Sequence, residues 1–232
     1  AGEPKYLNSP ETPLFQKGSE LYGLFEARQA IRDKGYVLVT EGYMDVVALA
    51  QFGFEQAVAT LGTACTPTHV QKLLRQTDQV IFSFDGDAAG RRAARRALEA
   101  CLPHASDSRT LKFLFLPKEH DPDSYIREHG HQAFEKLVLD SVPLSQFLVN
   151  EVTEGKDLST AEGRARAQFD AKPLLQAMPV SALRLQLLRQ LAQVTESTVQ
   201  EIESLFELEV RVTSKRAATP AVRRKPPVEL ER

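Results

Sequence analysis

Acidic residues stand directly after apolar runs that are typical of buried strands. Glu41 follows the run 36–40, and Asp85 and Asp87 follow the run 80–84. Two residues apart in an extended segment, Asp85 and Asp87 project to the same side. Because the carboxyl ends of parallel strands meet at one edge of a sheet, we expect these three carboxylates to lie close together.

Three further acids extend this group. Asp45 falls in the first turn of the helix predicted after Glu41, and Asp121 and Asp123 follow the run 111–116. Each of these acids has a second interpretation. A negative charge in the first turn of a helix interacts favourably with the helix dipole, which would explain Asp45 equally well. The two acids that flank Pro122 equally suit a turn or a helix N-cap. The joint arrangement of six carboxylates therefore carries the prediction of a site.

The chemistry expected of such a group is that of a divalent cation. Two carboxylates about 4 Å apart repel by several kcal/mol at an effective dielectric near 20, so a counterion is needed. Hard oxygen ligands favour Mg²⁺ or Mn²⁺. Cys65 and Cys101 cannot form a Cys-x-x-Cys zinc site, so we expect no zinc in this chain. Phosphoryl or nucleotidyl transfer is the indicated reaction class.

The histidines do not enter this site in the sequence interpretation. They show no metal-ligand pairing along the chain, and we expect a surface role for each of His69, His104, His120, His129 and His131.

The elements that must position the carboxylates alternate along the chain. Short apolar runs predict strands, helical spacing predicts helices between them, and a further helix is expected over 21–31, ending near Gly35. This order implies an α/β fold with a mainly parallel four-stranded sheet and helices on both faces. The predicted strands are 36–40, 56–61, 80–84 and 111–116, and the predicted helices between them are 43–52, 66–77 and 88–102.

Beyond Asp123 the strand signal disappears and an all-helical bundle is expected. A proline-rich segment over residues 2–18 predicts a loop, and residues 211–232 predict a disordered basic linker. The helices of the bundle are predicted over 132–139, 144–152, 160–177, 182–194 and 198–210.

Composition excludes several classes of protein. With 42% hydrophobic and 26% charged residues, the chain is neither wholly disordered nor a membrane protein, and no signal peptide is readable, which indicates the cytoplasm. The formal net charge of −2 gives no global basic footprint, so nucleic-acid binding would need a local patch. One candidate is a row of arginines on the helix 88–102, which equally suits a solvated face: Arg91, Arg92, Arg95 and Arg96.

Two motifs carry a resemblance to a known family. Glu41-Gly42-Tyr43-Met44-Asp45 and Asp85-Gly86-Asp87-Ala88-Ala89-Gly90 together resemble the Toprim signature of primases, topoisomerases and related enzymes. The preceding segment, from Lys5-Tyr6-Leu7-Asn8 to Leu21-Tyr22-Gly23-Leu24, resembles the bacterial replicative DNA primases of the DnaG type. The resemblance covers roughly residues 4 to 205.

The resemblance implies a role for each site residue. Glu41 would be the catalytic acid, Asp85 and Asp87 the metal-binding pair, and the remaining acids, Asp45, Asp121 and Asp123, would support the metals. Three polar residues of the N-terminal segment would face the nucleotide or the template, although a solvated loop explains them equally well: Lys5, Asn8 and Lys17.

The resemblance also implies a domain organisation. Residues 1–35 would end a basic nucleotide- and template-binding subdomain, 36–130 would form the Toprim domain, 131–210 the bundle, and 211–232 a linker. The zinc-binding and helicase-binding domains of such enzymes are expected to be absent. Because the chain starts with Ala1-Gly2, a fragment is expected, weakly active or inactive alone.

The function implied is synthesis of short RNA primers on a DNA template at replication forks, in the cytoplasm at the nucleoid. The expected partners are single-stranded DNA, ribonucleoside triphosphates and, through the domain expected to be absent, the replicative helicase; no membrane is expected. A Toprim nuclease and a non-catalytic scaffold remain alternatives. A type IA topoisomerase is disfavoured because no tyrosine lies in a separate strand-passage domain.

Overall fold

A six-stranded sheet forms the centre of the molecule in the computed structural model, which describes residues 11–12 and 15–208. Four parallel strands make up its middle, in the order β3-β2-β4-β5. They are β2 (Val37–Thr40), β3 (Ala57–Thr60), β4 (Gln79–Phe84) and β5 (Thr110–Phe115). Two short strands, β1 (Leu21–Tyr22) and β6 (Val142–Pro143), pair antiparallel with β3 and β5 at the two edges.

The central strands form because their side chains are apolar on both faces. All four residues of β2 and all four of β3 are buried. Val37 and Val39 pack into one hydrophobic cluster and Leu38 into another on the opposite face, as the two-residue period of a strand requires.

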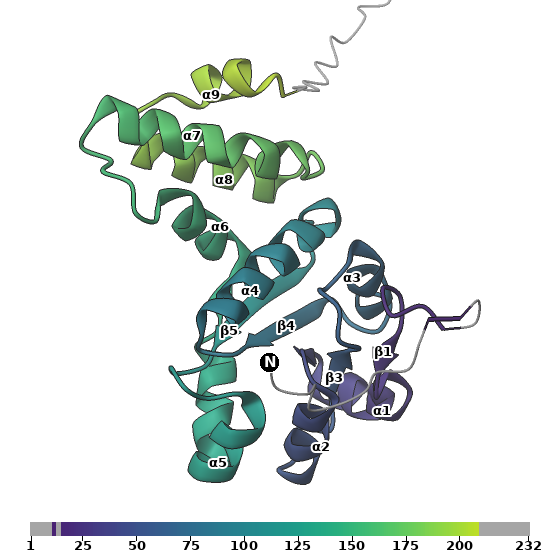
Figure 1. The fold of residues 1–232 in the computed structure, drawn as a ribbon. Coiled ribbons are helices and arrows are strands. Elements are labelled where there is room, and N and C mark those ends of the chain that lie inside the picture. Colours follow the sequence, from purple (N-terminus) through teal and green to yellow (C-terminus); the bar gives the residue numbers. More distant parts are fainter. Residues whose placement is uncertain (1–10, 13–14, 209–232) are drawn as a thin grey trace, which may run out of the picture.

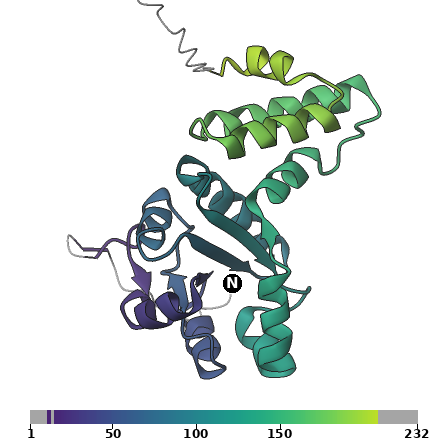
Figure 2. The same cartoon turned by 180° about the vertical axis from the view of Figure 1, so that it is seen from behind.

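Helices cover both faces of this sheet (Figures 1 and 2). One face packs against α1 (Leu24–Lys34), α3 (Pro67–Leu73) and α4 (Ala88–Cys101). A short 3-10 helix, η1 (Leu102–His104), follows α4. The other face packs against α2 (Tyr43–Gln51) and α5 (Pro122–Leu139). The predicted α/β class, with mostly parallel strands between helices, is confirmed.

Four helices after β6 form the predicted helical region, drawn in green to yellow in Figure 1. They are α6 (Leu144–Thr153), α7 (Ala161–Gln176), α8 (Ala182–Val194) and α9 (Val199–Phe206). Phe147 of α6 packs against Phe113 of β5, with ring centroids 4.6 Å apart, so this region shares its core with the sheet.

The sheet differs from the prediction at its edges. It has six strands rather than four, because Leu21–Tyr22, predicted as the start of a helix, forms β1, and β6 follows Asp123, where no strand was expected. Strands of two residues are too short to show a periodic pattern. Gly23, with a φ of 75°, separates β1 from the helix.

The helix α5 consists of two helical pieces that meet at a kink at Gly130, where φ is 78° and ψ is 179°. The predicted helix 132–139 corresponds to the piece after the kink. The piece before it, which starts at Pro122 with Asp121 as N-cap, was not predicted. The predicted domain boundary at residues 130/131 falls inside α5, and the domain division remains a prediction. No helix in the described part of the chain is long and apolar enough to cross a membrane.

Candidate metal and nucleotide site

The three acids predicted as catalytic lie where β2 and β4 end. Glu41 follows the last residue of β2, and Asp85 follows the last residue of β4. Asp87 is the N-cap of α4, and its Oδ1 accepts a hydrogen bond of 2.7 Å from the Gly90 N–H. The parallel pairing of the two strands therefore brings these carboxylates to one edge of the sheet.

The charges of neighbouring acids contribute to raised pKa values of Glu41 and Asp85. Burial and then the charges of Asp85 and Asp87 together raise the pKa of Glu41 to about 7, while Arg96 opposes the rise. Burial likewise raises the pKa of Asp85 to about 6, together with the charges of Asp121 and Asp87. The carboxylate edge, as we call Glu41, Asp85, Asp87 and Asp121, thus holds negative charges that destabilise one another.

Asp45 connects two helices at this edge. Its Oδ2 accepts a hydrogen bond from the Gly42 N–H (3.2 Å), and its Oδ1 accepts one from the Asp123 N–H (3.3 Å). Burial raises the pKa of Asp45 to about 7, as does the charge of Asp121, and the two hydrogen bonds oppose the rise. Both oxygens of this predicted metal ligand therefore also stabilise backbone at the starts of α2 and α5.

The acids after β5 have local partners as well. Asp121 accepts a hydrogen bond of 2.7 Å from the Ser124 N–H and so caps α5. Asp123 forms an ion pair with Arg127 one helical turn later. The structure thus places Asp121 beside Asp85 and Asp45, whereas the carboxylate of Asp123 pairs with a cation on its own helix.

Two glycines of the second motif allow this loop to pack closely. A Cβ on Gly86 would lie 2.2 Å from the carbonyl oxygen of Pro117, and a Cβ on Gly90 would lie 2.2 Å from that of Asp85. The Gly86 N–H also donates to the carbonyl of His120 (3.2 Å). Gly86 therefore allows the loops after β4 and β5 to lie close together, and Gly90 allows the first turn of α4 to pack on Asp85.

The donor set of the carboxylate edge suits a hard divalent cation. Oxygen donors with raised pKa values are the groups that a bound cation would stabilise in their charged form. Among the described residues, three possible ligand atoms come within 4.8 Å of one another only at His120, Glu128 and His129. The arrangement at the edge accordingly fits a cation held by one or two carboxylates, with water and phosphate oxygens completing its shell.

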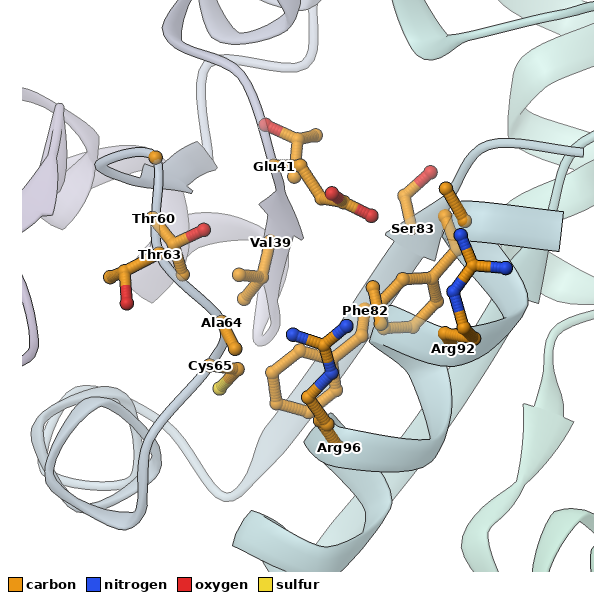
Figure 3. Close-up of a pocket in the computed structure, with 15 residues that line it drawn as sticks. Val39, Glu41, Thr60, Thr63, Ala64, Cys65, Phe82, Ser83, Arg92 and Arg96 are labelled. Carbon is orange, nitrogen blue, oxygen red and sulfur yellow. The ribbon is translucent and has the colours of Figure 1, made fainter. Parts of the chain in front are cut away.

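A cavity of about 370 Å³ opens beside Glu41 (Figure 3). Its wall is formed by the ends of β2 and β4, the loop after β3 and the first turns of α4. Ser83 lines it, and its buried Oγ has no hydrogen-bond partner in the part of the chain that the structure describes. A ligand in the cavity could supply that partner.

Two arginines of α4 line the same cavity. Arg92 and Arg96 extend from α4 beside it, and Arg96 is near enough to Glu41 to affect its pKa (Figure 3). The other two face elsewhere: Arg91 lies over the ring of Phe115, and Arg95 pairs with Glu99 and Glu151. Of the four arginines predicted as one row, two thus face the cavity and two face other partners. This division follows from how α4 packs on the sheet and could not be predicted from the spacing of the arginines.

Of the three residues predicted to face the nucleotide or the template, the structure describes only Lys17. The Lys17 N–H donates to Glu11, and the Lys17 carbonyl lies 2.9 Å from His69 Nε2, so its backbone is next to the N-terminus of α3. Lys5 and Asn8 lie outside the described residues, as does the segment 211–232. Binding of nucleotide or template by Lys5, Asn8 and Lys17 stays a prediction.

One expectation for the histidines is wrong. His69 is fully buried rather than at the surface, because its ring completes the N-terminal cap of α3: Nδ1 accepts a hydrogen bond from the Thr66 N–H (3.2 Å).

Comparisons with known proteins agree with this geometry. A family described as Toprim-like matches residues 38–126, and one described as the N-terminal domain of the DNA primase catalytic core matches residues 1–28. A DNA primase of Neisseria meningitidis serogroup B is 48% identical in an alignment that covers 98% of this chain and 39% of that protein. A solved DNA primase domain from Pseudomonas aeruginosa is 46% identical, with a TM-score of 0.84, over 89% of this chain and 64% of that one.

The chain belongs to the DnaG-type DNA primases. It spans about two fifths of the length of the curated primase that it matches. A structure described as the DnaG primase catalytic domain bound to single-stranded DNA is 50% identical, with a TM-score of 0.77, over 83% of this chain and 62% of that one. The two solved structures match 89% and 83% of this chain, whereas the residues before α6 make up less than two thirds of it. The similarity of this primase chain to both structures therefore extends into the helical region α6–α9.

One expectation about the primase domains is corrected. A family described as the DnaB-helicase binding domain of primase matches residues 145–200, so the expectation that this region is wholly absent is wrong. The matched residues run from α6 into α9. The Toprim domain of a primase implies the use of a divalent metal ion, in agreement with the donors of the carboxylate edge.

Proposed function

We propose that this chain supplies the metal- and nucleotide-binding part of a DNA-dependent RNA polymerase that makes short RNA primers for DNA replication. The observation that carries the proposal is the placement of the carboxylate edge where β2 and β4 end, next to a cavity with two arginines; burial and neighbouring charges raise the pKa values of Glu41 and Asp85 there. Anionic ligands for a cation and cationic ligands for phosphate stand side by side, as transfer of a nucleotidyl group requires.

In this proposal Glu41, Asp85 and Asp87 would hold Mg²⁺ or Mn²⁺, each ion being bound by one or two of these carboxylates. A bound ion would supply activation of the primer 3′-hydroxyl and stabilisation of charge on the α-phosphate. The chain itself keeps these donors in place: Asp87 is fixed by its bond to the Gly90 N–H, and the glycine loops bring Asp121 near. Asp45 holds the first turns of α2 and α5 together and so supports the site from behind.

Arg92 and Arg96 bind phosphate oxygens of the incoming ribonucleoside triphosphate in this proposal. Their guanidinium groups can form charge-assisted hydrogen bonds to phosphate, and Ser83 Oγ offers a further polar contact in the cavity. Single-stranded DNA is the template in this proposal, which the similar DnaG domain bound to single-stranded DNA supports. Such an enzyme acts in the bacterial cytoplasm, at replication forks.

Contact with the replicative helicase is a second proposed property, supported by the match over residues 145–200. In α7 the ring of Phe169 is 73% exposed, which is unusual for so large an apolar side chain. Leu205 of α9 is also exposed, and its carbonyl accepts a hydrogen bond from Lys172 Nζ, so it lies near α7. If these residues contact a helicase of the DnaB type, Phe169→Ser weakens binding measured by calorimetry and leaves thermal stability unchanged.

Primer synthesis tests the main proposal. In a protein of the relatives' full length that carries this region, Asp87→Asn should abolish incorporation of labelled ribonucleotides on single-stranded DNA. Asp78→Asn, at an exposed acid before β4, is the matched control and should synthesise normally. Near-normal synthesis by Asp87→Asn would refute the assignment, and metal-dependent shortening of the DNA would instead favour a nuclease.

A further inference from the structure

We propose that His120, Glu128 and His129 form a second metal site, for a transition-metal ion of the Zn²⁺ class, apart from the carboxylate edge. His120 lies in the connection from β5 to α5, and the other two residues lie on α5. One ligand atom from each comes within 4.8 Å of the other two. The sequence gives no sign of this group, because a loop and a helix bring it together.

Both imidazoles present the same nitrogen to the same carboxylate. His120 Nε2 lies 4.0 Å from Glu128 Oε2, and His129 Nε2 lies 3.8 Å from Glu128 Oε1. Ligand atoms of tetrahedral zinc lie about 3.4 Å apart, given bonds of about 2.0–2.1 Å. Glu128 is exposed and can rotate to close the difference.

The hydrogen bonds around His120 orient its ring for metal binding. Ser124 Oγ donates to the carbonyl of Asp121 (3.1 Å) and lies 3.4 Å from His120 Nδ1. His120 Nδ1 therefore has a polar neighbour in the first turn of α5, while Nε2 faces Glu128. A hydrogen bond at the ring nitrogen that does not bind the ion is typical of metal-binding histidines.

The backbone and a neighbouring ring hold the two imidazoles in place. The N–H of His120 donates to Pro117 (3.1 Å), and its carbonyl accepts from Gly86 (3.2 Å). The ring of Tyr125 packs against both imidazoles, with centroids 5.5 Å from that of His120 and 4.5 Å from that of His129. The ligands are therefore partly arranged before any ion binds.

Two imidazoles and one carboxylate form a ligand set for zinc rather than for magnesium, which prefers oxygen ligands. A water molecule would take the fourth position. Because His120 directly precedes Asp121, an ion here would tie the loop that carries Asp121 to the following turns of α5. The site would thus restrain one margin of the carboxylate edge without using its acids.

Calorimetric titration of the whole chain with Zn²⁺ tests the proposal. His120→Ala and His129→Ala should each weaken Zn²⁺ binding at least about tenfold, while His104→Ala, at the end of η1 and outside this cluster, should bind as the parent does. The double variant Asp85→Asn with Asp87→Asn should also retain Zn²⁺ binding. Thermal unfolding without metal verifies that each variant is folded.

Substitution with Co²⁺ gives an independent spectroscopic readout. The parent should show the visible absorption of a tetrahedral cobalt site, and His129→Ala should lose it. Parent-like Zn²⁺ affinity in both histidine variants would overturn the proposal. Loss of Zn²⁺ binding only in the double aspartate variant would also overturn it, because zinc would then occupy the carboxylate edge.

Discussion

Asp45 Oδ1 accepts a hydrogen bond of 3.3 Å from the backbone N–H of Asp123, 78 residues later in the chain. This bond joins the first turn of α2 to the first turn of α5 on the same face of the sheet. The other carboxylate oxygen of Asp45 accepts from Gly42, next to Glu41. One acid thus fixes the positions of the backbone beside two others.

Asp45→Ala should therefore lower stability as well as activity. Two backbone N–H groups lose their acceptor, which we expect to cost roughly 1–2 kcal/mol, reduced somewhat because the repulsion from Asp121 also disappears. Asp123→Asn, which keeps the backbone donor, should change the free energy of unfolding by only about 0.5 kcal/mol. Urea unfolding measures both, and an Asp45→Ala variant as stable as the parent would contradict the bridging role.

Gly90→Ala should disturb the site through backbone packing. The added Cβ would lie 2.2 Å from the Asp85 carbonyl, so Asp85 must shift, at a cost of roughly 1–3 kcal/mol. Gly163→Ala is a matched control, because its Cβ would meet the Asp157 carbonyl at 1.9 Å in the corresponding turn of α7. Both variants should melt earlier, but only Gly90→Ala should bind Mn²⁺ more weakly; equal Mn²⁺ binding in the two would exclude this effect on Asp85.

Stability of the metal-free chain should fall as the pH rises. The folded chain holds protons on Glu41 (pKa about 7) and Asp85 (pKa about 6) more tightly than the unfolded chain does, in which carboxyl pKa values are near 4. The free energy of unfolding therefore loses the contribution of these groups between about pH 4 and pH 7.

Asp85→Asn isolates this effect. In the presence of a chelator, the variant should be more stable than the parent at about pH 8, by roughly 1 kcal/mol, since Glu41 is only partly buried and solvent screens part of the repulsion. Near pH 5 the difference should largely vanish. Thermal unfolding at both pH values tests it, and a variant that is less stable than the parent at pH 8 would show that the repulsion is negligible.

Arg96→Gln should weaken nucleotide binding. The loss of one guanidinium beside the cavity should reduce affinity for a ribonucleoside triphosphate with Mg²⁺ roughly tenfold, as expected for one charge-assisted contact. Arg95→Gln removes an equal charge from the same helix, but that arginine pairs with Glu99 and Glu151 away from the cavity. Fluorescence anisotropy with a labelled triphosphate measures the affinity of both variants. Equal losses of affinity in Arg96→Gln and Arg95→Gln would contradict a direct contact by Arg96 and would indicate only long-range electrostatics.

The sequence was sufficient for the parallel centre of the fold. Continuous apolar runs such as 80–84 are buried on both faces, and a strand of that kind needs helices around it. The edges were not predictable in this way, since β1 and β6 have two residues each and depend on pairing with β3 and β5. The first half of α5 was missed because Asp121-Pro122 also suits a turn and Gly130 breaks the period.

The sequence allowed us to predict the kinds of residue in the site, but only some of the contacts between them. Placement after parallel strands was enough to predict that Glu41, Asp85 and Asp87 lie at one edge of the sheet, but the pairing of β2 with β4 was not predictable in this way. Their role as metal ligands stays a prediction. The bond of Asp45 to Asp123, and the cavity lined by Arg92 and Arg96, depend on how α2, α4 and α5 pack on the sheet. Such contacts between segments distant in the sequence leave no local pattern.

Titration of the chain with Mn²⁺ by calorimetry tests the central claim most directly. The parent and the control Asp78→Asn should bind the ion, and the double variant Asp85→Asn with Asp87→Asn should not. A parent that binds no Mn²⁺, or a double variant that binds it as tightly as the parent, would contradict the assignment of the metal to the carboxylate edge.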